Sequence, residues 1–398
     1  MNVYIVTREN ILGGKAGASR VRCYAKALLS QNITCTVLLI KQSKGNGIQK
    51  SGIHEEIPYE AMGTEITTNR YSYRRYISYL RDDIALIRYL SGKLEPGDVI
   101  FEYGTTVFHT FFLIAIAHRR NAMFVRDLCE YPFGTQKEDF MSWLQRYIVL
   151  KFQFPIYDGV VAISDSLTDL AKTYCPSNCI IVKVPILVEF DNYNLADKSD
   201  SSDIPYIFHS GTLYEQKDGF VGMIDAFGKA CEDPNFRYNF VSTGNILNSP
   251  HANEIEKLLN KYGIQKRVFF TGYLTQSDLC EYLQGASMVI INKYNNQQNK
   301  YCFSTKLAEY LAAGKPLIIT KVGEAMNWLT NMKDAIIINP NDKKQLVSAI
   351  LNISMDTELR HKLSVNARKT CRQSFDIMRW SLFLKEFFLN VSNKSVKK

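Results

Sequence analysis

Residues 302–320, CFSTKLAEYLAAGKPLIIT, join a short helical pattern to an apolar strand pattern, and this alternation decides the fold. Ser304 or Thr305 is a natural N-cap, and Gly314 is a residue type that commonly follows the end of a helix. Pro316 then opens the apolar run PLIIT. A helix followed at once by a buried strand is one half of a βαβ unit, so this stretch predicts an α/β fold with a parallel sheet.

The same alternation extends over the whole chain. Short, almost continuously apolar runs are typical of strands buried on both faces, and they occur at 2–7, 35–40, 98–103, 122–127, 159–164, 206–211, 238–244, 268–273, 287–292, 316–320 and 335–339. Helical patterns such as ASRVRCYAKALL lie between them. We therefore expect two doubly wound, Rossmann-like halves facing a central cleft, with ligands outside the carboxyl ends of the strands.

A polar stretch rich in Asp, Asn and Ser interrupts this alternation, and we interpret it as a linker between two domains. The expected division is an N-terminal domain at 1–190, the linker at 191–203, a C-terminal domain at 204–375, and a final helix with a frayed tail at 376–398. The final helical pattern, IMRWSLFLKEFFLNV, has more apolar surface than one helix face needs. This excess favours packing back against the N-terminal domain.

The composition fits this division and excludes several classes of protein. A chain of 398 residues is long enough for two cores, and 46% hydrophobic with 22% charged residues is an ordinary globular composition. Met1 leads straight into a strand pattern, so we expect no signal peptide. The apolar run around FFLIAIA is about half a bilayer span, so we expect no membrane-crossing segment.

The cysteines and the net charge say less about function. Nine scattered cysteines predict reduced thiols in a cytoplasmic protein, and the pair Cys175 and Cys179 lacks the further ligands that zinc needs. The net charge of +9 fits nucleic acid, a membrane surface or a phosphorylated ligand without choosing among them. The Arg- and Tyr-rich segment 70–90 is consistent with binding to anionic lipid or a phosphorylated acceptor, but a surface helix with Arg stems packed on Tyr rings is the favoured interpretation.

The start of the helix in the opening stretch is a candidate anion site. Free amides, the small side chains of Ser304 and Thr305, and the cation Lys306 suit a diphosphate. Glu309 points away from the apolar stripe of this helix and could accept hydrogen bonds from the two hydroxyls of a ribose. From spacing alone, a capped helix with a solvated Glu309 is the favoured alternative.

Two glycine-containing loops add to this candidate site. Gly211 ends the first strand of the second half, where it allows close approach of a ligand, and Lys217 follows as a point charge for phosphate. Gly13, Gly14 and Gly17 lie between the first strand and the first helix, but not in the GxGxxG spacing of a nicotinamide site. A loop of this kind could admit a sugar or phosphate, and a mobile turn is the alternative.

The three features together resemble the retaining glycosyltransferases of family four, the "group 1" family, which have the GT-B fold. The resemblance extends over nearly the whole chain and is strongest over 206–340, where GTLYEQKDG and FSTKLAEYLAAGKP occur in the family's order. It implies an N-terminal acceptor-binding domain and a C-terminal domain that binds a nucleotide-sugar. The implied donor-site residues are Gly13, Gly14, Gly211, Thr212, Lys217, Gly244, Tyr273, Ser304, Thr305, Lys306 and Glu309.

The resemblance also assigns roles and shows two departures. Glu309 matches the ribose-binding Glu and Lys217 the diphosphate Lys, while Tyr273 falls near the nucleobase. Tyr301 stands where the family often has a Glu that contacts the donor sugar, and Thr212 stands where it often has an Arg. We expect Lys300 or Lys293 to supply the missing charge.

The ends of two strands in the first half supply further candidates for the cleft. The segments FEYGTTVFHT and VRDLCEYPFG contain Glu102, His109, Arg126, Asp127 and Glu130. An acid there could orient an acceptor hydroxyl or the donor sugar. We therefore count Asp127, Glu130 and His109 with Lys217 and Glu309 as catalytic candidates, although a core histidine and a loop-capping Asp127 are open alternatives.

The function that we expect is transfer of a sugar from a nucleoside-diphosphate sugar to a glycan or lipid-linked acceptor, as in bacterial cell-surface polysaccharide synthesis. We expect no cofactor and no essential metal, because the acidic pair in RDD (81–83) lies in a helical pattern. A cytoplasmic enzyme at the inner face of an anionic membrane would suit the charge. The alternatives are a nucleotide-sugar epimerase of the same fold and, less favoured, a non-catalytic nucleic-acid binder, against which the basic residues are dispersed.

Overall fold

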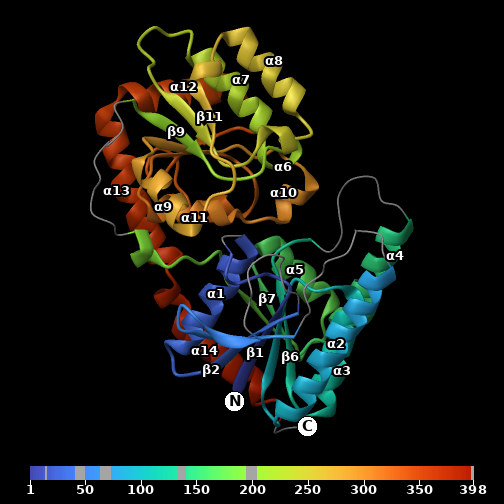
Figure 1. Cartoon of the computed structure of the whole chain (residues 1–398). Coiled ribbons are helices and arrows are strands. Elements are labelled where there is room, and N and C mark those ends of the chain that lie inside the picture. Colours follow the sequence, from blue (N-terminus) through green and yellow to red (C-terminus); the bar gives the residue numbers. More distant parts are fainter. Residues whose placement is uncertain (14–15, 41–49, 63–72, 132–139, 194–203, 396–398) are drawn as a thin grey trace. The chain divides into compact units, whose positions relative to one another are not determined.

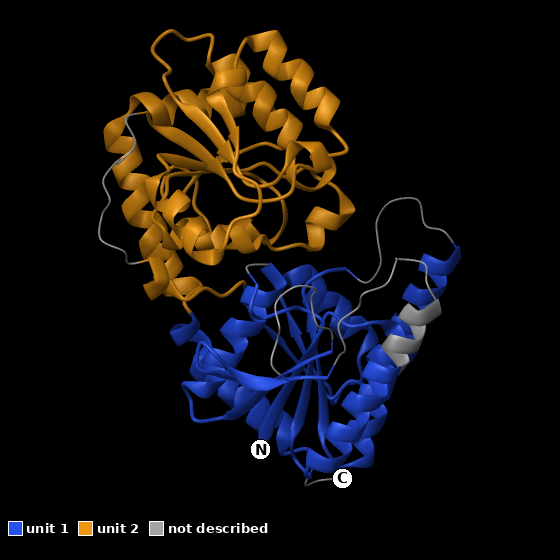
Figure 2. Ribbon diagram, viewed as in Figure 1, with its two compact units in different colours: residues 1–185, 377–398 blue, residues 186–376 orange. Residues whose placement is uncertain are grey.

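The computed structural model describes residues 1–13, 16–40, 50–62, 73–131, 140–193 and 204–395. They form two compact units, each described here by itself: unit 1 is Met1–Pro185 with Ile377–Lys398, and unit 2 is Ile186–Asp376 (Figure 2). The first crossing between units therefore precedes residue 190, where the sequence placed the domain end. Of the expected linker, residues 191–193 belong to the short 3-10 helix η3 (Phe190–Tyr193) of unit 2, and 194–203 lie outside the described residues.

The described part of unit 1 contains an eight-stranded sheet in the order β3-β4-β2-β1-β5-β6-β7-β8 (Figure 1). Neighbouring strands are parallel except β3 and β4, which form an antiparallel hairpin at one edge. The strands are β1 (Asn2–Thr7), β2 (Thr34–Leu39), β3 (Ser51–His54), β4 (Ile57–Ala61), β5 (Val99–Tyr103), β6 (Met123–Leu128), β7 (Gly159–Ala162) and β8 (Ile180–Lys183).

Helices cover this sheet and bury its apolar faces. The last helix of the chain, α14, packs against α1 and against β5, which confirms that it packs back on unit 1. Its surplus apolar side chains, Met378, Leu382, Phe383 and Leu389, remain exposed. The helices are α1 (Ala16–Leu29), α2 (Tyr73–Lys93), α3 (Val107–Arg119), α4 (Phe140–Ile148), α5 (Asp165–Tyr174) and α14 (Ile377–Ser392), with a π-turn η1 (Val149–Gln153) and a 3-10 turn η2 (Phe154–Ile156) after α4. The side chains of residues 71–80, in the Arg- and Tyr-rich segment, lie outside the described part.

Unit 2 contains, in its described residues, a parallel six-stranded sheet in the order β11-β10-β9-β12-β13-β14 (Figure 1). The chain starts in the middle at β9, moves outward to β11, and returns to β12 on the other side of β9. The direction of winding therefore reverses between β9 and β12. The strands are β9 (Tyr206–His209), β10 (Asn239–Ser242), β11 (Val268–Phe270), β12 (Met288–Ile291), β13 (Leu317–Thr320) and β14 (Ile336–Ile338).

The helices of unit 2 cover both faces of its sheet. Helices α7, α8 and α12 pack together on one face, and α11 packs with α13 on the other. The elements are α6 (Glu215–Asp218), α7 (Phe220–Ala230), η4 (Ile246–Asn248), α8 (Ala252–Tyr262), η5 (Gln265–Arg267), α9 (Gln276–Gly285), α10 (Gln297–Tyr301), α11 (Thr305–Ala312), η6 (Gly323–Asn327), α12 (Lys343–Met355) and α13 (Thr357–Ser374). Apolar side chains of β9, β10, β12 and α7 are fully buried and form the centre of one core.

Every strand that the sequence predicted is present, to within a few residues at its ends. The sequence missed β3 and β8, the two edge strands of the unit 1 sheet, and β4, which lies between β3 and β2. Edge strands bury one side only, and the burial of β3 and β8 is partial along their whole length, so their sequences lack the continuous apolar run of a central strand. Among the described residues, no helix is both long and apolar enough to span a bilayer.

Candidate functional site

The carboxyl edge of the unit 2 sheet has the geometry of a ligand site. Helices following strands on either side of a reversal lie on opposite faces of the sheet, which leaves a crevice at the strand ends. At the reversal in unit 2, β9 ends at His209 and is followed by Ser210 and Gly211, while β12 is followed by Asn292 and Lys293. The segments that the sequence singled out therefore converge at one point of the fold.

The loop after β9 is held against the end of β12 by a glycine. Gly219 has φ +61°, and a Cβ atom there would lie 2.3 Å from the carbonyl oxygen of Asn292. The side chain of Asn292 donates to the carbonyl of Gly219 over 2.9 Å. This close approach fixes the preceding turn α6, in which Lys217 is exposed and Asp218 is buried.

Asp218 of this loop belongs to a largely buried cluster of ionisable side chains with Lys306 and His209. Lys306, on the first turn of α11, makes a 2.8 Å ion pair with Asp218, and its Nζ lies 3.5 Å from Nε2 of His209. Thr212 donates both its amide and its hydroxyl to Asp218, over 3.1 and 2.6 Å. Burial acts to raise the pKa of Asp218, but Lys306, His209 and Lys293 outweigh it and lower that pKa below its usual range. The carboxylate is therefore charged, and it partly compensates the cations around it.

His209 takes part in this cluster as a neutral ring. Its Nδ1 lies 3.1 Å from Oγ of Ser242. Burial first, and then the neighbouring Lys306, lower the pKa of His209 to about 3. The ring is therefore uncharged at neutral pH and accommodates the Lys306 ammonium at close range without repulsion.

The low pKa of His209 predicts a pH-dependent stability. Between about pH 3 and its unfolded pKa of about 6.5, the unfolded chain binds a proton that the folded chain does not bind. The contribution of His209 to the free energy of unfolding is therefore complete above about pH 7. It falls as the pH drops and is about 2 kcal/mol smaller at pH 5. We expect the free energy of urea unfolding of His209→Asn to depend less on pH by that amount. An equal pH dependence in wild type and variant would contradict this assignment.

Lys293 is a second buried cation at the reversal, 7% exposed. The hydroxyl of Thr320 fixes its backbone by accepting from the Lys293 amide and donating to its carbonyl, each over 2.8 Å. Its Nζ donates to neutral oxygens, the Asn299 side chain at 3.3 Å and the Lys217 carbonyl at 3.5 Å. The ammonium thus lies beside the Lys217 turn. Lys300, the other lysine expected to supply charge, is exposed.

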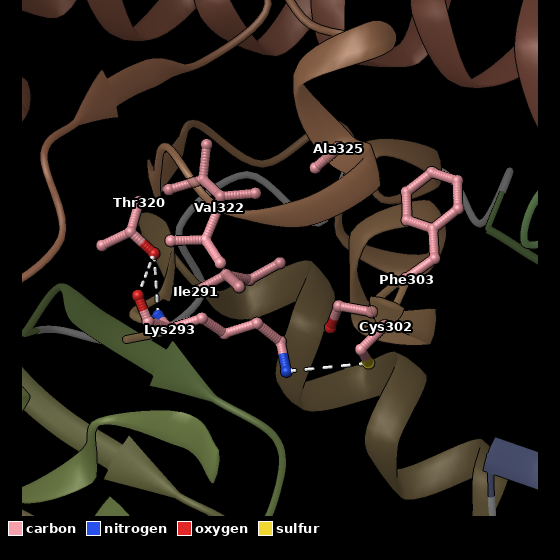
Figure 3. A pocket seen from close by; sticks show the side chains of 9 residues that line it. Ile291, Lys293, Cys302, Phe303, Thr320, Val322 and Ala325 are labelled. Atoms are coloured by element: carbon pink, nitrogen blue, oxygen red, sulfur yellow. Dashed lines mark hydrogen bonds between the residues drawn. The ribbon is translucent and has the colours of Figure 1, made fainter. Parts of the chain in front are cut away.

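A small pocket lies next to Lys293 (Figure 3). Its side chains come from the ends of β12 and β13 and from the residues before α11: Ile291, Lys293, Cys302, Phe303, Ser304, Ile319, Thr320, Val322 and Ala325. In Figure 3 the lysine ammonium points toward the Cys302 sulfur, 4.0 Å away. The pocket therefore borders both Lys293 and the N-cap of α11.

Helix α11 starts at this pocket with donors available. Its N-cap is Ser304, whose side chain makes no capping hydrogen bond, and its first turn carries no acid. Such a helix start presents backbone amides and a partial positive charge. The predicted apolar stripe of this helix is confirmed, since Leu307, Tyr310 and Leu311 are fully buried. The Tyr310 hydroxyl accepts from the Ser210 amide over 2.8 Å, which joins α11 to the end of β9.

Glu309 lies one turn further along α11 and is half-buried. Its charge acts on α9, where burial first and then Glu309 raise the pKa of the Cys280 thiol. Gly244 and Gly272, after β10 and β11, exchange two backbone hydrogen bonds of 2.9 and 3.1 Å. This bridge leads directly to Tyr273, which is 75% exposed. Two glycines and the exposed ring of Tyr273 thus lie at the carboxyl ends of β10 and β11.

The catalytic candidates of unit 1 lie mostly in buried polar contacts. Asp127 is bound by Arg20 over 3.0 and 3.1 Å and accepts from the Tyr24 hydroxyl over 2.9 Å. His109 is buried with its Nδ1 2.7 Å from Oδ1 of Asp83. These contacts join α1 to β6 and α3 to α2, so both residues have a clear structural task.

The remaining unit 1 candidates differ in exposure. Glu102 is fully buried in a 2.5 Å ion pair with Arg126 and accepts from Thr110 over 2.9 Å. Glu130 is exposed just after β6. The Gly13 carbonyl accepts from Arg22 over 2.8 Å, and Gly14 lies outside the described residues. Glu130 is therefore the one unit 1 catalytic candidate whose side chain is open to solvent.

Sequence reasoning missed Asp218, His209 and the position of Lys293 inside the cluster. The tripeptide KDG at 217–219 held a signal, because an acid next to a phosphate-binding lysine needs a cationic partner of its own. Among the described residues, no three His, Cys, Asp or Glu side chains come together as metal ligands.

The comparison with protein families agrees with this geometry. Residues 194–370 match the family model of Glycosyl transferases group 1. The match lies within unit 2 and covers most of it. The matched residues include the whole cationic cluster, with Lys217, Asp218, Lys293 and Lys306. The region that resembles this family thus carries the candidate anion site at its strand reversal.

The curated relatives are partial matches. The lipopolysaccharide core biosynthesis glycosyltransferase LpsD of Rhizobium meliloti is 27% identical over 181 residues, which are 45% of this chain and 48% of that protein. The mannosylfructose-phosphate synthase of Agrobacterium fabrum is 21% identical over 161 residues, 39% of this chain and 34% of that protein. The chain spans about half the length, or less, of the curated relatives it matches.

Solved structures extend the likeness to the whole fold. Sucrose-phosphate synthase from Thermosynechococcus elongatus superimposes with a TM-score of 0.72 at 14% identity, over 97% of both chains. Anabaena HepE in complex with UDP-glucose gives 0.71 at 15% identity, over 97% of this chain and 98% of that one. The chain therefore has the GT-B fold, and residues 194–370 are similar to glycosyltransferases of group 1.

Proposed function

We propose that the chain is a retaining glycosyltransferase that transfers a sugar from a nucleoside-diphosphate sugar to a hydroxyl of a glycan or lipid-linked acceptor. The observation that carries this proposal is the convergence of Lys306, Lys293 and Lys217 with the start of α11 at the strand reversal of unit 2. Three cations against the one carboxylate of Asp218 leave the site positive. The relative LpsD, named for lipopolysaccharide core biosynthesis, supports a role in cell-surface polysaccharide synthesis.

The cationic cluster suits the chemistry of this transfer. When the bond between the anomeric carbon and the diphosphate breaks, negative charge develops on the leaving oxygen. Preorganised cations and amides stabilise that charge without reorganisation at the moment of reaction. In the proposed complex, Lys306 and the amides of α11 face one phosphate, and Lys217 and Lys293 face the other. In the same complex we assign Glu309, one turn along α11, to the hydroxyls of the nucleoside ribose.

Retention of configuration is the second part of the proposal. It rests on the family resemblance, in which the acceptor hydroxyl attacks from the side that the diphosphate leaves, and the leaving phosphate accepts the hydroxyl proton. The cluster supplies what such a route needs, because it holds the leaving diphosphate in place while the new bond forms. A product of unchanged anomeric configuration, identified by NMR, is the expected outcome.

A ligand screen tests the proposal directly. We expect nucleoside diphosphates and their sugars to raise the melting temperature, starting with UDP and UDP-glucose because HepE binds them. A ligand at a hundredfold over its dissociation constant stabilises by about 2.7 kcal/mol. Stabilisation by UDP with no stabilisation by uridine would show that the diphosphate is bound. Conversion of the donor alone into an altered nucleotide-sugar would favour an epimerase instead.

Lys217→Ala gives the corresponding test by mutation. Lys217 is exposed on α6, so we expect the free energy of unfolding to change by less than about 0.5 kcal/mol. Loss of its charge from the leaving group should lower kcat/KM by about 10- to 100-fold. Lys266→Ala, at an exposed lysine of the same unit, is the matched control and should be neutral. Turnover of Lys217→Ala within about threefold of wild type would remove Lys217 from the site.

A further inference from the structure

Unit 1 carries an exposed row of aromatic side chains that the proposed chemistry does not use. Phe140, Trp143, Tyr147 and Phe152 are 70%, 45%, 45% and 55% exposed. We call these four residues the aromatic ladder. They lie on α4 and the adjoining π-turn η1, at the outer edge of unit 1 (Figures 1 and 2).

The ladder is ordered by contacts between its own rings. The rings of Phe140 and Trp143 stack with centroids 5.9 Å apart, and those of Trp143 and Tyr147 stack at 5.7 Å. The ring of Phe152 meets Tyr147 edge-on at 6.1 Å. None of the nine residues of α4 is buried. The helix therefore presents a continuous aromatic strip about 18 Å long, from the rise of 1.5 Å per residue.

The neighbouring helix extends this apolar surface. Phe108 and Phe112 of α3 are 72% and 50% exposed. The side chain of Gln153, at the end of η1, donates to the Val107 carbonyl at the start of α3 over 2.6 Å, so the two segments adjoin. Contiguous apolar surface of this kind marks a site of interaction rather than ordinary solvent-facing surface.

The charge of the two segments identifies the kind of partner. Residues 107–120, VFHTFFLIAIAHRR, and 140–156, FMSWLQRYIVLKFQFPI, contain four Arg and Lys residues and no Asp or Glu. Lys151 is exposed and precedes Phe152 in the sequence, and its ammonium lies 5.3 Å from the centroid of the Tyr174 ring. Amphipathic aromatic rings are favoured at the boundary between lipid and water, and Lys and Arg are attracted to anionic headgroups.

We propose that the aromatic ladder is a membrane-binding surface that places its rings at the headgroup level of an anionic bilayer, with Lys151 beside them. The ladder and its charge carry this inference independently of the donor site in unit 2. An amphipathic helix with one exposed apolar face and basic neighbours binds in the plane of the interface, without crossing the bilayer. Unit 1 would then hold the enzyme at the surface where a lipid-linked acceptor is found.

Sedimentation with vesicles tests the proposal with the full chain. We expect wild type to bind vesicles of phosphatidylcholine mixed with phosphatidylglycerol at low salt, and to bind pure phosphatidylcholine more weakly. The double variant Trp143→Ser with Phe152→Ser should lose at least about tenfold in partitioning. The matched control, Leu247→Ser with Met355→Ser, removes two exposed apolar side chains of unit 2 and should bind as wild type does.

Reversing the charge of Lys151 separates the electrostatic part of vesicle binding from the part due to the aromatic rings. Lys151→Glu should weaken binding to the anionic vesicles several-fold and leave binding to phosphatidylcholine unchanged. Lys266→Glu in unit 2 is the control of equal charge change. Lipids brominated near the headgroup should quench wild-type tryptophan fluorescence, and Trp143→Phe should abolish most of that quenching while still binding.

Several outcomes would overturn the proposal. They are absence of wild-type binding, equal binding by the ladder variant and its control, and quenching that persists in Trp143→Phe. Self-association in the absence of lipid that the ladder variant abolishes would assign this surface to a second copy of the chain. The shift in melting temperature with UDP, measured on the same ladder variant, shows separately whether the donor site is intact.

Discussion

Lys306→Met should abolish donor binding and lower kcat/KM by about 100- to 1000-fold, the effect of removing one preorganised group from a developing anion. Lys306 lies on the first turn of α11, in contact with both Asp218 and His209. Its ammonium therefore lies at the carboxyl end of β9, beside Gly211, where we expect the diphosphate. Isothermal titration with UDP and initial-rate kinetics measure the two effects.

The same substitution should also destabilise the protein, and a second variant separates this from the loss of binding. Without Lys306 the buried carboxylate of Asp218 has no ion-pair partner, which costs about 3 kcal/mol. Adding Asp218→Asn removes that charge while keeping an acceptor for Thr212, so the double variant should regain most of the stability. It should not regain UDP binding. Recovery of both together would mean that Lys306 acts only by maintaining the fold.

Burial lowers the pKa of Lys306, and Asp218 is the main group that raises it. Asp218→Asn alone should still keep UDP binding, because the bound diphosphate then takes over the stabilisation of the Lys306 charge. It removes the one carboxylate that opposes a diphosphate, so binding at least as tight as wild type is the expected result. A loss of UDP binding comparable to that of Lys306→Met would instead show that Asp218 has to orient Lys306.

Gly219→Ala should have the largest effect on stability. The residue combines φ +61° with a Cβ position 2.3 Å from a backbone oxygen of Asn292. The left-handed conformation alone costs an alanine about 1–2 kcal/mol. The clash adds to this because a backbone carbonyl at the end of a central strand cannot move aside as a flexible side chain would. We expect a loss of more than about 3 kcal/mol in the free energy of unfolding.

Gly263→Ala is the matched control for this prediction. Gly263 also ends a helix, α8, and has φ +65°, but an added Cβ would meet no atom within 4 Å. Its cost should be that of the left-handed conformation only. Urea unfolding of the two variants therefore isolates the clash with Asn292. Equal costs at the two positions would show that the loop between α6 and α7 moves away from β12 without penalty.

Much of the fold followed from the sequence because local patterns report local burial. The run PLIIT gave β13, and the pattern from Ser304 to Gly314 gave α11, with its buried stripe and its N-cap. The edge strands β3 and β8 escaped detection because an edge position does not require a continuous apolar run. The end of unit 1 at Pro185 and the 3-10 helix η3 were also not evident, since the polar stretch that follows dominates the composition there.

The candidate site was predictable only in part. Lys217, Lys306 and Glu309 were singled out because a helix start and a strand end are local features with known chemistry. Asp218 and His209 were not, because each matters through residues far away in the sequence. Asp127 shows the converse. Its position at the end of a strand suggested catalysis, but its carboxylate accepts hydrogen bonds from Arg20 and Tyr24.

The sequence by itself determined the α/β alternation, the helix that begins at Ser304 and the lysines around the second glycine loop. Only the tertiary structure decided which charges meet, because that depends on the strand order. Lys306 and Asp218 are 88 residues apart, and Arg20 and Asp127 are 107 apart. Helix and strand periodicities act over a few residues, whereas such pairs form only once a parallel sheet has brought its carboxyl ends to one edge.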